Sequence, residues 1–364
     1  MNDIYSWWVE VDFLAVGDKQ SGDAVCVRLG NCRRGQSSQY VIVIDGGFKG
    51  DGDRVVSHLR EYYYTEEIDL LISSHPHQDH NQGMLEIVDK CRVKDFAIHQ
   101  PWTHVGLADL FEDKRATCKS IKGRLSTHLA ISRELVQLAG EKRVGCVFEP
   151  FAGKNMQFNI LGFQVILLSP SEEFYDFCLR HFACTPDEKS WPNATRLKYN
   201  NKEVLYECCR LTDDGATSAE NNASTVLLII CPDGQQLLFT ADAGMPALYK
   251  SIARASALGI RLNRLSFFQV PHHGSVQNIG PVALGYLSPC SWLGKNSYAG
   301  VSVASSPDNE HPALLVLNAV KEKGFDVYET HGTNILFPFG NYPLRNWKTV
   351  EPFAGSRMVQ EFVS

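Results

Sequence analysis

The stretch Ser74-His75-Pro76-His77-Gln78-Asp79-His80 places three imidazoles and one carboxylate close together in the chain. The run before it, from Ile68 to Ser73, is apolar and favours a short buried strand. His75 and His77 can lie on one side of an extended chain, because its side chains repeat every second residue, whereas Asp79 and His80 follow the turn and can face a second ion. Zinc and similar ions accept imidazole nitrogen and carboxylate oxygen without a thiolate. The stretch therefore predicts a metal site at the end of a strand.

Two later segments repeat this arrangement of an apolar run that ends in polar ligands. The run 237–240 leads to the carboxylate of Asp242, and the run 267–270 leads to the adjacent imidazoles of His272 and His273. A surface loop with chance histidines explains the first stretch less well, because the chain has only 12 His and three stand there beside an aspartate. Strands that each end in candidate ligands predict one site for two metal ions.

Together these segments resemble the metallo-β-lactamase superfamily, and within it the soluble hydrolase domain of ComEC-type competence proteins. The resemblance spans nearly the whole chain. It is carried by the His-x-His-x-Asp-His stretch, by Val11–Gly17 with Ser21-Gly22-Asp23-Ala24, by Ile44-Asp45-Gly46-Gly47, by Thr240-Ala241-Asp242 where the family usually has Thr-Gly-Asp, by Val270-Pro271-His272-His273-Gly274-Ser275, and by Ser305-Ser306 followed by His311-Pro312. It implies an α/β fold, the metallo-β-lactamase αββα sandwich of two mixed β-sheets flanked by helices.

The resemblance also implies two divalent metal ions, Zn or Mn, held by imidazole and carboxylate ligands. The first ion would be held by His75 and His77, the second by Asp79, His80 and His273, and both by a bridging Asp242. Two ions held in this way activate water for attack on phosphorus or on a carbonyl carbon.

Two residues of this region are candidates for catalysis itself. Asp79 can orient the nucleophile in addition to binding an ion. His272 is the imidazole left beside the ligand His273, and it can contact a phosphate or protonate a leaving group. Which of these two adjacent histidines is the ligand stays open. Asp45, in the first motif, is implied to hydrogen-bond around the metal loop and to orient ligands from behind.

The sequence departs from the family pattern shortly before the bridging aspartate. Many members carry another His there as a third ligand of the first ion, whereas this chain reads Glu220-Asn221-Asn222-Ala223-Ser224-Thr225. The first ion is therefore expected to be completed by water, by Asn222 or by substrate. Ser275 and His311 are further candidates for substrate contacts. His311 precedes an expected helix N-terminus, where anions are favoured, and a capping or surface role explains it equally well.

Composition and cysteine usage indicate a cytoplasmic protein. No stretch approaches the ~20 consecutive apolar residues of a membrane helix, and the first residues lack the basic and apolar parts of a signal peptide. The 11 Cys are scattered in apolar surroundings, as expected of reduced core thiols. A net charge of −6 without a long basic run weakens, but does not exclude, a protein that grips long nucleic acid along its backbone.

The chain is expected to form a single domain over residues 1–364, with an insertion at about 172–220 that either shapes the substrate site or decorates the surface. Strands are expected near residues 7–47, 68–73, 144–148, 158–168, 226–230, 237–240, 325–328 and 334–337. Helices are expected at 54–63, 83–91, 107–138, 246–258 and 312–323.

Three functions are compatible with these observations. The resemblance favours a phosphodiesterase or nuclease that acts on a phosphodiester-containing substrate such as a nucleotide or nucleic acid, without a membrane partner. The alternative is a hydrolase of a small carbonyl substrate, such as a lactone, thioester or β-lactam, and the missing third His and the His-His-Gly-Ser motif speak against it. A non-catalytic interaction protein is disfavoured, because decay of function would be expected to remove ligands and the core set is intact. Whether the protein has a protein partner stays open.

Overall fold

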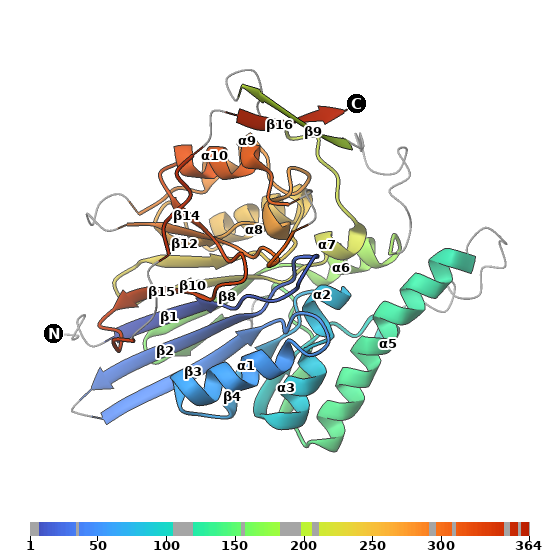
Figure 1. Cartoon of the computed structure of the whole chain (residues 1–364). Helices are drawn as coiled ribbons and strands as arrows, with labels where there is room; N and C mark the ends of the chain where they lie inside the picture. Colours follow the sequence, from blue (N-terminus) through green and yellow to red (C-terminus); the bar gives the residue numbers. More distant parts are fainter. Residues whose placement is uncertain are drawn as a thin grey trace.

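The structure is a computed structural model of the whole chain, shown in Figure 1. The residues that it describes are 7–33, 36–104, 119–153, 157–182, 198–205, 211–290, 296–307, 311–345, 350–355 and 358–363.

The first sheet has seven strands in the order β15-β1-β2-β3-β4-β5-β6. Their bounds are β1 Trp7–Phe13, β2 Val25–Arg33, β3 Gln36–Ile44, β4 Glu67–Ile72, β5 Arg92–Ala97, β6 Cys146–Phe148 and β15 Ile335–Gly340. The pairs from β15 to β3 are antiparallel, and the pairs from β3 to β6 are parallel. The carboxyl ends of β3, β4 and β5 therefore lie at one edge of the sheet.

The second sheet also has seven strands, in the order β14-β13-β12-β11-β10-β8-β7. Their bounds are β7 Gln157–Ile160, β8 Phe163–Ser169, β10 Val226–Ile230, β11 Gln236–Phe239, β12 Leu265–Gln269, β13 Tyr298–Val301 and β14 Asp326–Glu329. The pairs from β7 to β11 are antiparallel, and the pairs from β11 to β14 are parallel. Parallel pairing again brings the carboxyl ends of β11 and β12 to the same edge.

Helices cover the outer faces of both sheets (Figure 1). On the first sheet lie α1 Gly52–His58, the π-helical turn η1 Leu59–Tyr63, α3 Met84–Lys90 and α5 Lys119–Glu141, with the short α2 Gln78–Asn81 and η2 Pro101–Thr103 in its loops. On the second lie α6 Glu172–Leu179, α7 Ala219–Asn222, α8 Met245–Ala257, α9 Pro281–Tyr286 and α10 Leu314–Glu322, with η5 His272–Gly274 in the loop after β12. Two mixed sheets between helical layers confirm the predicted α/β sandwich.

The inner faces of the two sheets form an apolar core that fixes how they pack on each other. The ring of Phe267 on β12 packs against Phe13 on β1 at 5.6 Å and against Phe337 on β15 at 5.0 Å between ring centroids. Each fully buried aromatic side chain contributes about 1.5–3 kcal/mol relative to exposure to water. The core therefore holds the edges of the two sheets in a fixed relation to each other.

Several element boundaries differ from those expected. Of the expected helix at 107–138, residues 107–118 lie outside the described residues, and α5 runs on to Glu141. The closing strands β14 and β15 join different sheets, so the chain crosses the sandwich between them. Within the segment at about 172–220, β9 Lys198–Leu205 pairs with the last strand, β16 Met358–Val363, in a separate two-stranded sheet, while residues 183–197 and 206–210 lie outside the described residues.

Among the described residues, no helix is both long enough and apolar enough to cross a membrane.

Candidate metal centre

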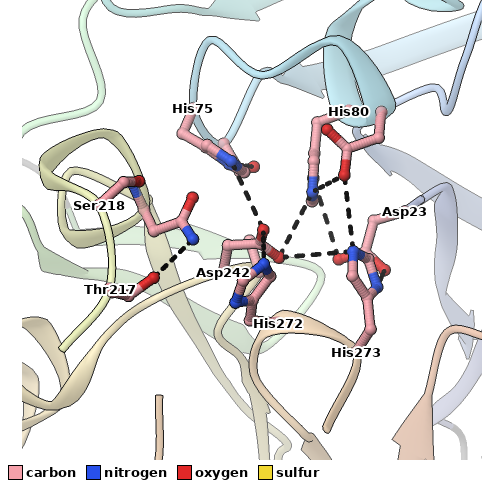
Figure 2. A network of polar contacts seen from close by, with 12 residues as sticks. Asp23, His75, His80, Thr217, Ser218, Asp242, His272 and His273 are labelled. Carbon is pink, nitrogen blue, oxygen red and sulfur yellow. Dashed lines mark hydrogen bonds and ion pairs between the residues drawn. The ribbon is translucent and has the colours of Figure 1, made fainter. Parts of the chain in front are cut away.

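The residues singled out in the sequence lie in loops that meet at one edge of the sandwich. These loops are Ser74–His80 after β4, Thr240–Gly244 after β11 and His272–Ser275 after β12. Parallel pairing places the carboxyl ends of β11 and β12 together within the second sheet, and packing of the two sheets brings the loop after β4 against them. Figure 2 shows His75, His80, His272 and His273 around the carboxylate of Asp242.

One group of candidate ligands consists of Asp79, His80, Asp242 and His273, whose ligand atoms all lie within 4.8 Å of one another. His80 Nε2 is 3.4 Å from Asp242 Oδ1 and 3.6 Å from Asp79 Oδ2. His273 Nε2 is 3.6 Å from Asp79 Oδ2 and 3.9 Å from Asp242 Oδ1. Three of these side chains are buried, whereas that of Asp79 is 25% exposed. The group is therefore enclosed by protein and open on the side of Asp79.

A second group consists of His75, His77 and Asp242, again within 4.8 Å of one another. His75 Nε2 lies 3.7 Å from Asp242 Oδ2, whereas the first group faces Oδ1 of the same carboxylate. The two oxygens of Asp242 thus face two different sets of imidazoles. This is the arrangement that a carboxylate bridging two ions requires.

The spacing of these atoms fits metal ligands better than hydrogen-bonded side chains. Nitrogen-to-oxygen distances of 3.4–3.9 Å exceed those of good hydrogen bonds. Two ligands that are each ~2.0–2.2 Å from one tetrahedral ion are roughly 3.3–3.6 Å apart. Several of the buried atoms have no hydrogen-bond partner, and they are Nε2 of His75, His80 and His273 and Oδ1 of Asp242. Buried polar atoms without partners are costly, so the donor set fits two divalent cations.

The electrostatics of the site favour ionised carboxylates and added positive charge. Burial alone would raise the pKa of Asp242, but His272, His80 and His273 outweigh it and hold the pKa well below its usual range. Burial alone would lower the pKa of His80, but Asp242 and other carboxylates raise it well above the usual value. In His75 burial prevails and lowers the pKa well below its usual value, so this imidazole is neutral. A neutral imidazole beside a carboxylate is a suitable ligand for a cation.

Asp45 anchors one imidazole of each group from behind, as expected of an orienting residue. Its Oδ2 accepts hydrogen bonds from His80 Nδ1 at 2.8 Å and from Ser74 Oγ at 2.6 Å, and its Oδ1 accepts one from Ser74 N–H at 2.7 Å. Because the Ser74 hydroxyl donates to Asp45, it accepts from His75 Nδ1, which is 3.0 Å away. In His75 the Nε2 lone pair is thereby directed at the site.

Asp23 is a site residue to which the sequence analysis assigned no role. Its side chain is buried, with Oδ1 3.8 Å from His273 Nδ1 and Oδ2 4.0 Å from His80 Nδ1. With Asp45 and His80 it forms a third group of close ligand atoms. Its backbone N–H donates to the carbonyl oxygen of Asp79, which ties its loop to the metal loop. The sequence feature that could have identified Asp23 is its position in Ser21-Gly22-Asp23-Ala24, one of the segments that carry the family resemblance.

His272 lies on the exposed side of Asp242 and is held by Asn278. The Asn278 amide donates through Nδ2 to the backbone carbonyl of Asp242 at 2.8 Å, which turns its Oδ1 toward His272 Nδ1 at 2.9 Å. Since Oδ1 can only accept, His272 Nδ1 carries a proton. His272 Nε2 then faces the site, 3.5 Å from Asp242 Oδ2, on a side chain that is 25% exposed.

Four residues of this site have strained backbone conformations. Positive φ angles occur at Asp45 (60°), Ala241 (45°), His272 (47°) and His273 (54°), none of which is glycine. Such left-handed conformations are unfavourable for residues with a Cβ and persist only where the surroundings enforce them. The loops after β3, β11 and β12 are therefore held in shapes that serve the ligands at a cost in stability.

Asn222, which the sequence suggested could complete the first ion, is bonded through its amide nitrogen and has a buried amide oxygen. It is 1% exposed, its Nδ2 donates to Ser218 O at 3.1 Å, and its Oδ1 has no hydrogen-bond partner. An added Cβ on Gly244 would lie 2.4 Å from this oxygen. Asn222 also lines a cavity of about 110 Å³, together with Asp213, Asp214, Gly215, Ala216, Thr217, Met245, Pro246 and Tyr249. This cavity adjoins the loop that carries Asp242.

The other two candidates for substrate contacts are placed differently from each other. Ser275 is buried, and its Oγ accepts the backbone N–H of Gln277 at 3.2 Å, which assigns this hydroxyl to the turn. His311 lies beside His272, with ring centroids 5.3 Å apart, and stands shortly before α10. His311 thus borders the exposed side of the site.

Comparisons with known proteins give weak likenesses. No protein-family model matches the chain, and no curated protein matches it. Among solved structures, the unliganded crystal structure of yeast PDE1 has a TM-score of 0.42 and 11% identity, over 89% of this chain and 97% of that one. A metallo-beta-lactamase from Pontibacter korlensis has a TM-score of 0.26 and 11% identity, over 68% of this chain and 84% of that one.

Proposed function

We propose that this chain is a metal-dependent hydrolase that cleaves phosphodiesters, with a nucleotide or nucleic acid as substrate. The observation that carries the proposal is the position of Asp242, whose two oxygens face two separate sets of imidazoles. His75, His77 and Asp242 would hold one divalent ion, Zn or Mn. The other would be held by Asp79, His80, His273 and the same Asp242. When bound, such a pair of ions stabilises charge on a phosphoryl group and lowers the pKa of water.

The side chains at the open face supply the remaining functions. Asp79 is the most exposed carboxylate of its group, so it can orient an attacking water and accept its proton. His272 presents Nε2 toward Asp242 Oδ2 on a side chain that is 25% exposed, in an orientation fixed by Asn278, and can contact the phosphate or protonate the leaving group. His311 lies next to it and can contact the same anion. The buried ligands exclude water from the other side of the site.

The proposal is tested by a substrate panel. Metal-loaded protein should hydrolyse a bis-aryl phosphodiester and leave an aryl ester and a lactone nearly untouched. His272→Gln should lower kcat on a substrate with a poor leaving group more than on one with a good leaving group, because only the former needs a proton donor. Hydrolysis of the ester or lactone in preference to the phosphodiester would contradict the substrate class, and no hydrolysis of any substrate by metal-loaded protein would contradict the enzyme.

A further inference from the structure

Gln269, the last residue of β12, joins separate parts of the metal centre through one buried amide. Its side chain is 2% exposed. Its Oε1 accepts the backbone N–H groups of Thr240 and Ala241, each at 3.0 Å, and its Nε2 donates to Asp23 Oδ2 at 2.9 Å. Backbone N–H groups can only donate and an ionised carboxylate can only accept, so the orientation of the amide is determined by its partners.

The oxygen of this amide holds the segment that presents the bridging carboxylate. Thr240 and Ala241 immediately precede Asp242, and the Thr240 hydroxyl returns a hydrogen bond to the backbone carbonyl of Gln269 at 2.8 Å. Ala241 has a φ of 45°, a conformation that a residue with a Cβ adopts at a cost. Two hydrogen bonds to one oxygen offset part of this cost and fix the direction in which the chain enters Asp242.

The nitrogen of the same amide holds the carboxylate behind the second group of ligands. Asp23 Oδ2 accepts from Gln269, and the two oxygens of Asp23 lie 3.8 Å from His273 Nδ1 and 4.0 Å from His80 Nδ1. Without the hydrogen bond from Gln269 Nε2, the buried carboxylate of Asp23 could turn toward or away from these imidazoles. The orientation of both rings would then be less well defined.

We propose that Gln269 is a positioning residue of the metal centre, which sets the bridging carboxylate and the carboxylate behind the second ion in one rigid unit. This inference rests on the proposed function, since it concerns the same two ions. It goes beyond the ligand set, because the Gln269 amide is hydrogen-bonded to Thr240, Ala241 and Asp23 and would not itself be a ligand. It predicts that metal affinity depends on an amide at the end of β12.

Two substitutions distinguish the role of the Gln269 amide oxygen from that of its amide nitrogen. Gln269→Met keeps a buried side chain of similar size but removes the amide oxygen and the amide nitrogen. It should therefore lower the affinity for each of the two ions about 10–100-fold. Gln269→Glu keeps an oxygen that accepts from Thr240 and Ala241, but it places a carboxylate oxygen next to the carboxylate of Asp23. It should therefore lower mainly the affinity for the second ion. Affinities are measured by calorimetric titration of apo-protein with Zn²⁺ alone, and the ligand geometry is followed by the visible absorption of the Co²⁺-loaded protein.

Gln235 provides a matched control. Its side chain is 1% exposed, its Oε1 accepts from Ser266 Oγ at 2.8 Å and its Nε2 donates to Asp233 Oδ2 at 2.5 Å, but it stands before β11, at the end away from Asp242. Gln235→Met should lose a similar amount of stability and keep wild-type affinity for both ions. Should Gln269→Met not fold, Gln269→Glu decides.

The outcomes separate this inference from the function on which it rests. Wild-type Zn²⁺ affinity and Co²⁺ spectra in both Gln269 variants would overturn the inference and leave the proposed function standing. An equal loss of affinity in Gln235→Met would overturn it too, since the effect would then come from general destabilisation. A wild-type protein that binds no Zn²⁺ would overturn the proposed function itself.

Discussion

Replacing Asp45 by Asn should lower the affinity for both metal ions without unfolding the protein. The carboxylate of Asp45 accepts from His80 Nδ1, from the Ser74 hydroxyl and from the Ser74 N–H, and through this hydroxyl it also reaches His75. An Asn side chain has the same shape but only one acceptor oxygen for these donors, so its NH₂ must face one of them. Asn also tolerates the φ of 60° at this position, so the backbone need not move.

The size of the effect follows from the two imidazoles that Asp45 positions, His80 directly and His75 through the Ser74 hydroxyl. His80 loses a charge-assisted hydrogen bond of 2.8 Å, and loss of such a partner behind a metal-binding imidazole typically costs 10–100-fold in affinity, or about 1.4–2.7 kcal/mol. His75 is reached only through Ser74, so the loss at the first ion should be smaller. Ser74→Ala breaks this second branch alone, and it should weaken the first ion while leaving the second within about twofold of the wild type.

The assay is competitive titration of apo-protein against a chromogenic Zn²⁺ chelator, with thermal unfolding of the apo forms measured in parallel. Asp51→Asn serves as the control, because Asp51 is also buried and its Oδ2 accepts backbone N–H groups from Gly17 and Phe48. This control should change stability and leave both affinities unchanged. If Asp45→Asn binds both ions like the wild type, the anchoring role argued for this carboxylate is wrong.

Three further predictions concern activity, strain and pH. Asp79→Ala should lower phosphodiesterase turnover at least ~100-fold while the circular dichroism spectrum stays unchanged, because the change removes a ligand and the residue that orients water; near wild-type turnover would place the activity elsewhere. Ala241→Gly should raise the free energy of unfolding by up to about 1 kcal/mol in urea titrations, since relief of ~1–2 kcal/mol of left-handed strain exceeds the entropy cost of Gly; a loss of stability would mean that Ala241 is not strained. Arg345→Met should cost about 3–5 kcal/mol at pH 7, because Nε and Nη1 of Arg345 pair with buried Glu10 and Asp12 at 2.9 Å. Burial alone would raise the pKa of Asp12, but His58 and Arg345 lower it below its usual value. The stability that the ionised Asp12 contributes is therefore fully present above its unfolded-state pKa of about 4. It is lost as the pH falls through the pKa of Asp12 in the folded protein. The difference between wild type and Arg345→Met in urea titrations should therefore shrink in acid, and a constant difference would contradict this reasoning.

The ligand loops could be predicted from the sequence because the signal for each of them is local. An apolar run that ends in His, Asp or paired His indicates a strand followed by a ligand loop, and the parallel halves of both sheets place these ends together. The alternation of His75 and His77 predicted that they would face one ion, and the structure places them in one group. The role of Asp45 could be stated only through a resemblance, since nothing in the residues around it indicates which imidazole it contacts.

The contacts that orient the ligands could not be predicted, because they join distant segments. Gln269 and Asp23 are 246 residues apart in the chain, and their hydrogen bond exists only once the two sheets have packed. Strand β1 misleads in the same way. Glu10 and Asp12 alternate with apolar residues, a pattern that is typical of a face in contact with water, yet all seven residues of the strand are buried. Their charges are met instead by Arg28, Arg345 and His58, which come from three separate parts of the chain.

The ions would bind across the junction between the two sheets. The loop after β4 contributes His75, His77, Asp79 and His80 from the first sheet, whereas the loops after β11 and β12 contribute the ligands from the second. A ligand set divided in this way has its geometry only when the sheets are closed on their shared aromatic core. Positive φ angles occur on both sides of this junction, at Asp45 and at Ala241. Binding energy from two cations can offset this strain in the folded state alone, since the unfolded chain presents no assembled site. Binding of the two ions should therefore stabilise the folded sandwich relative to the apo-protein.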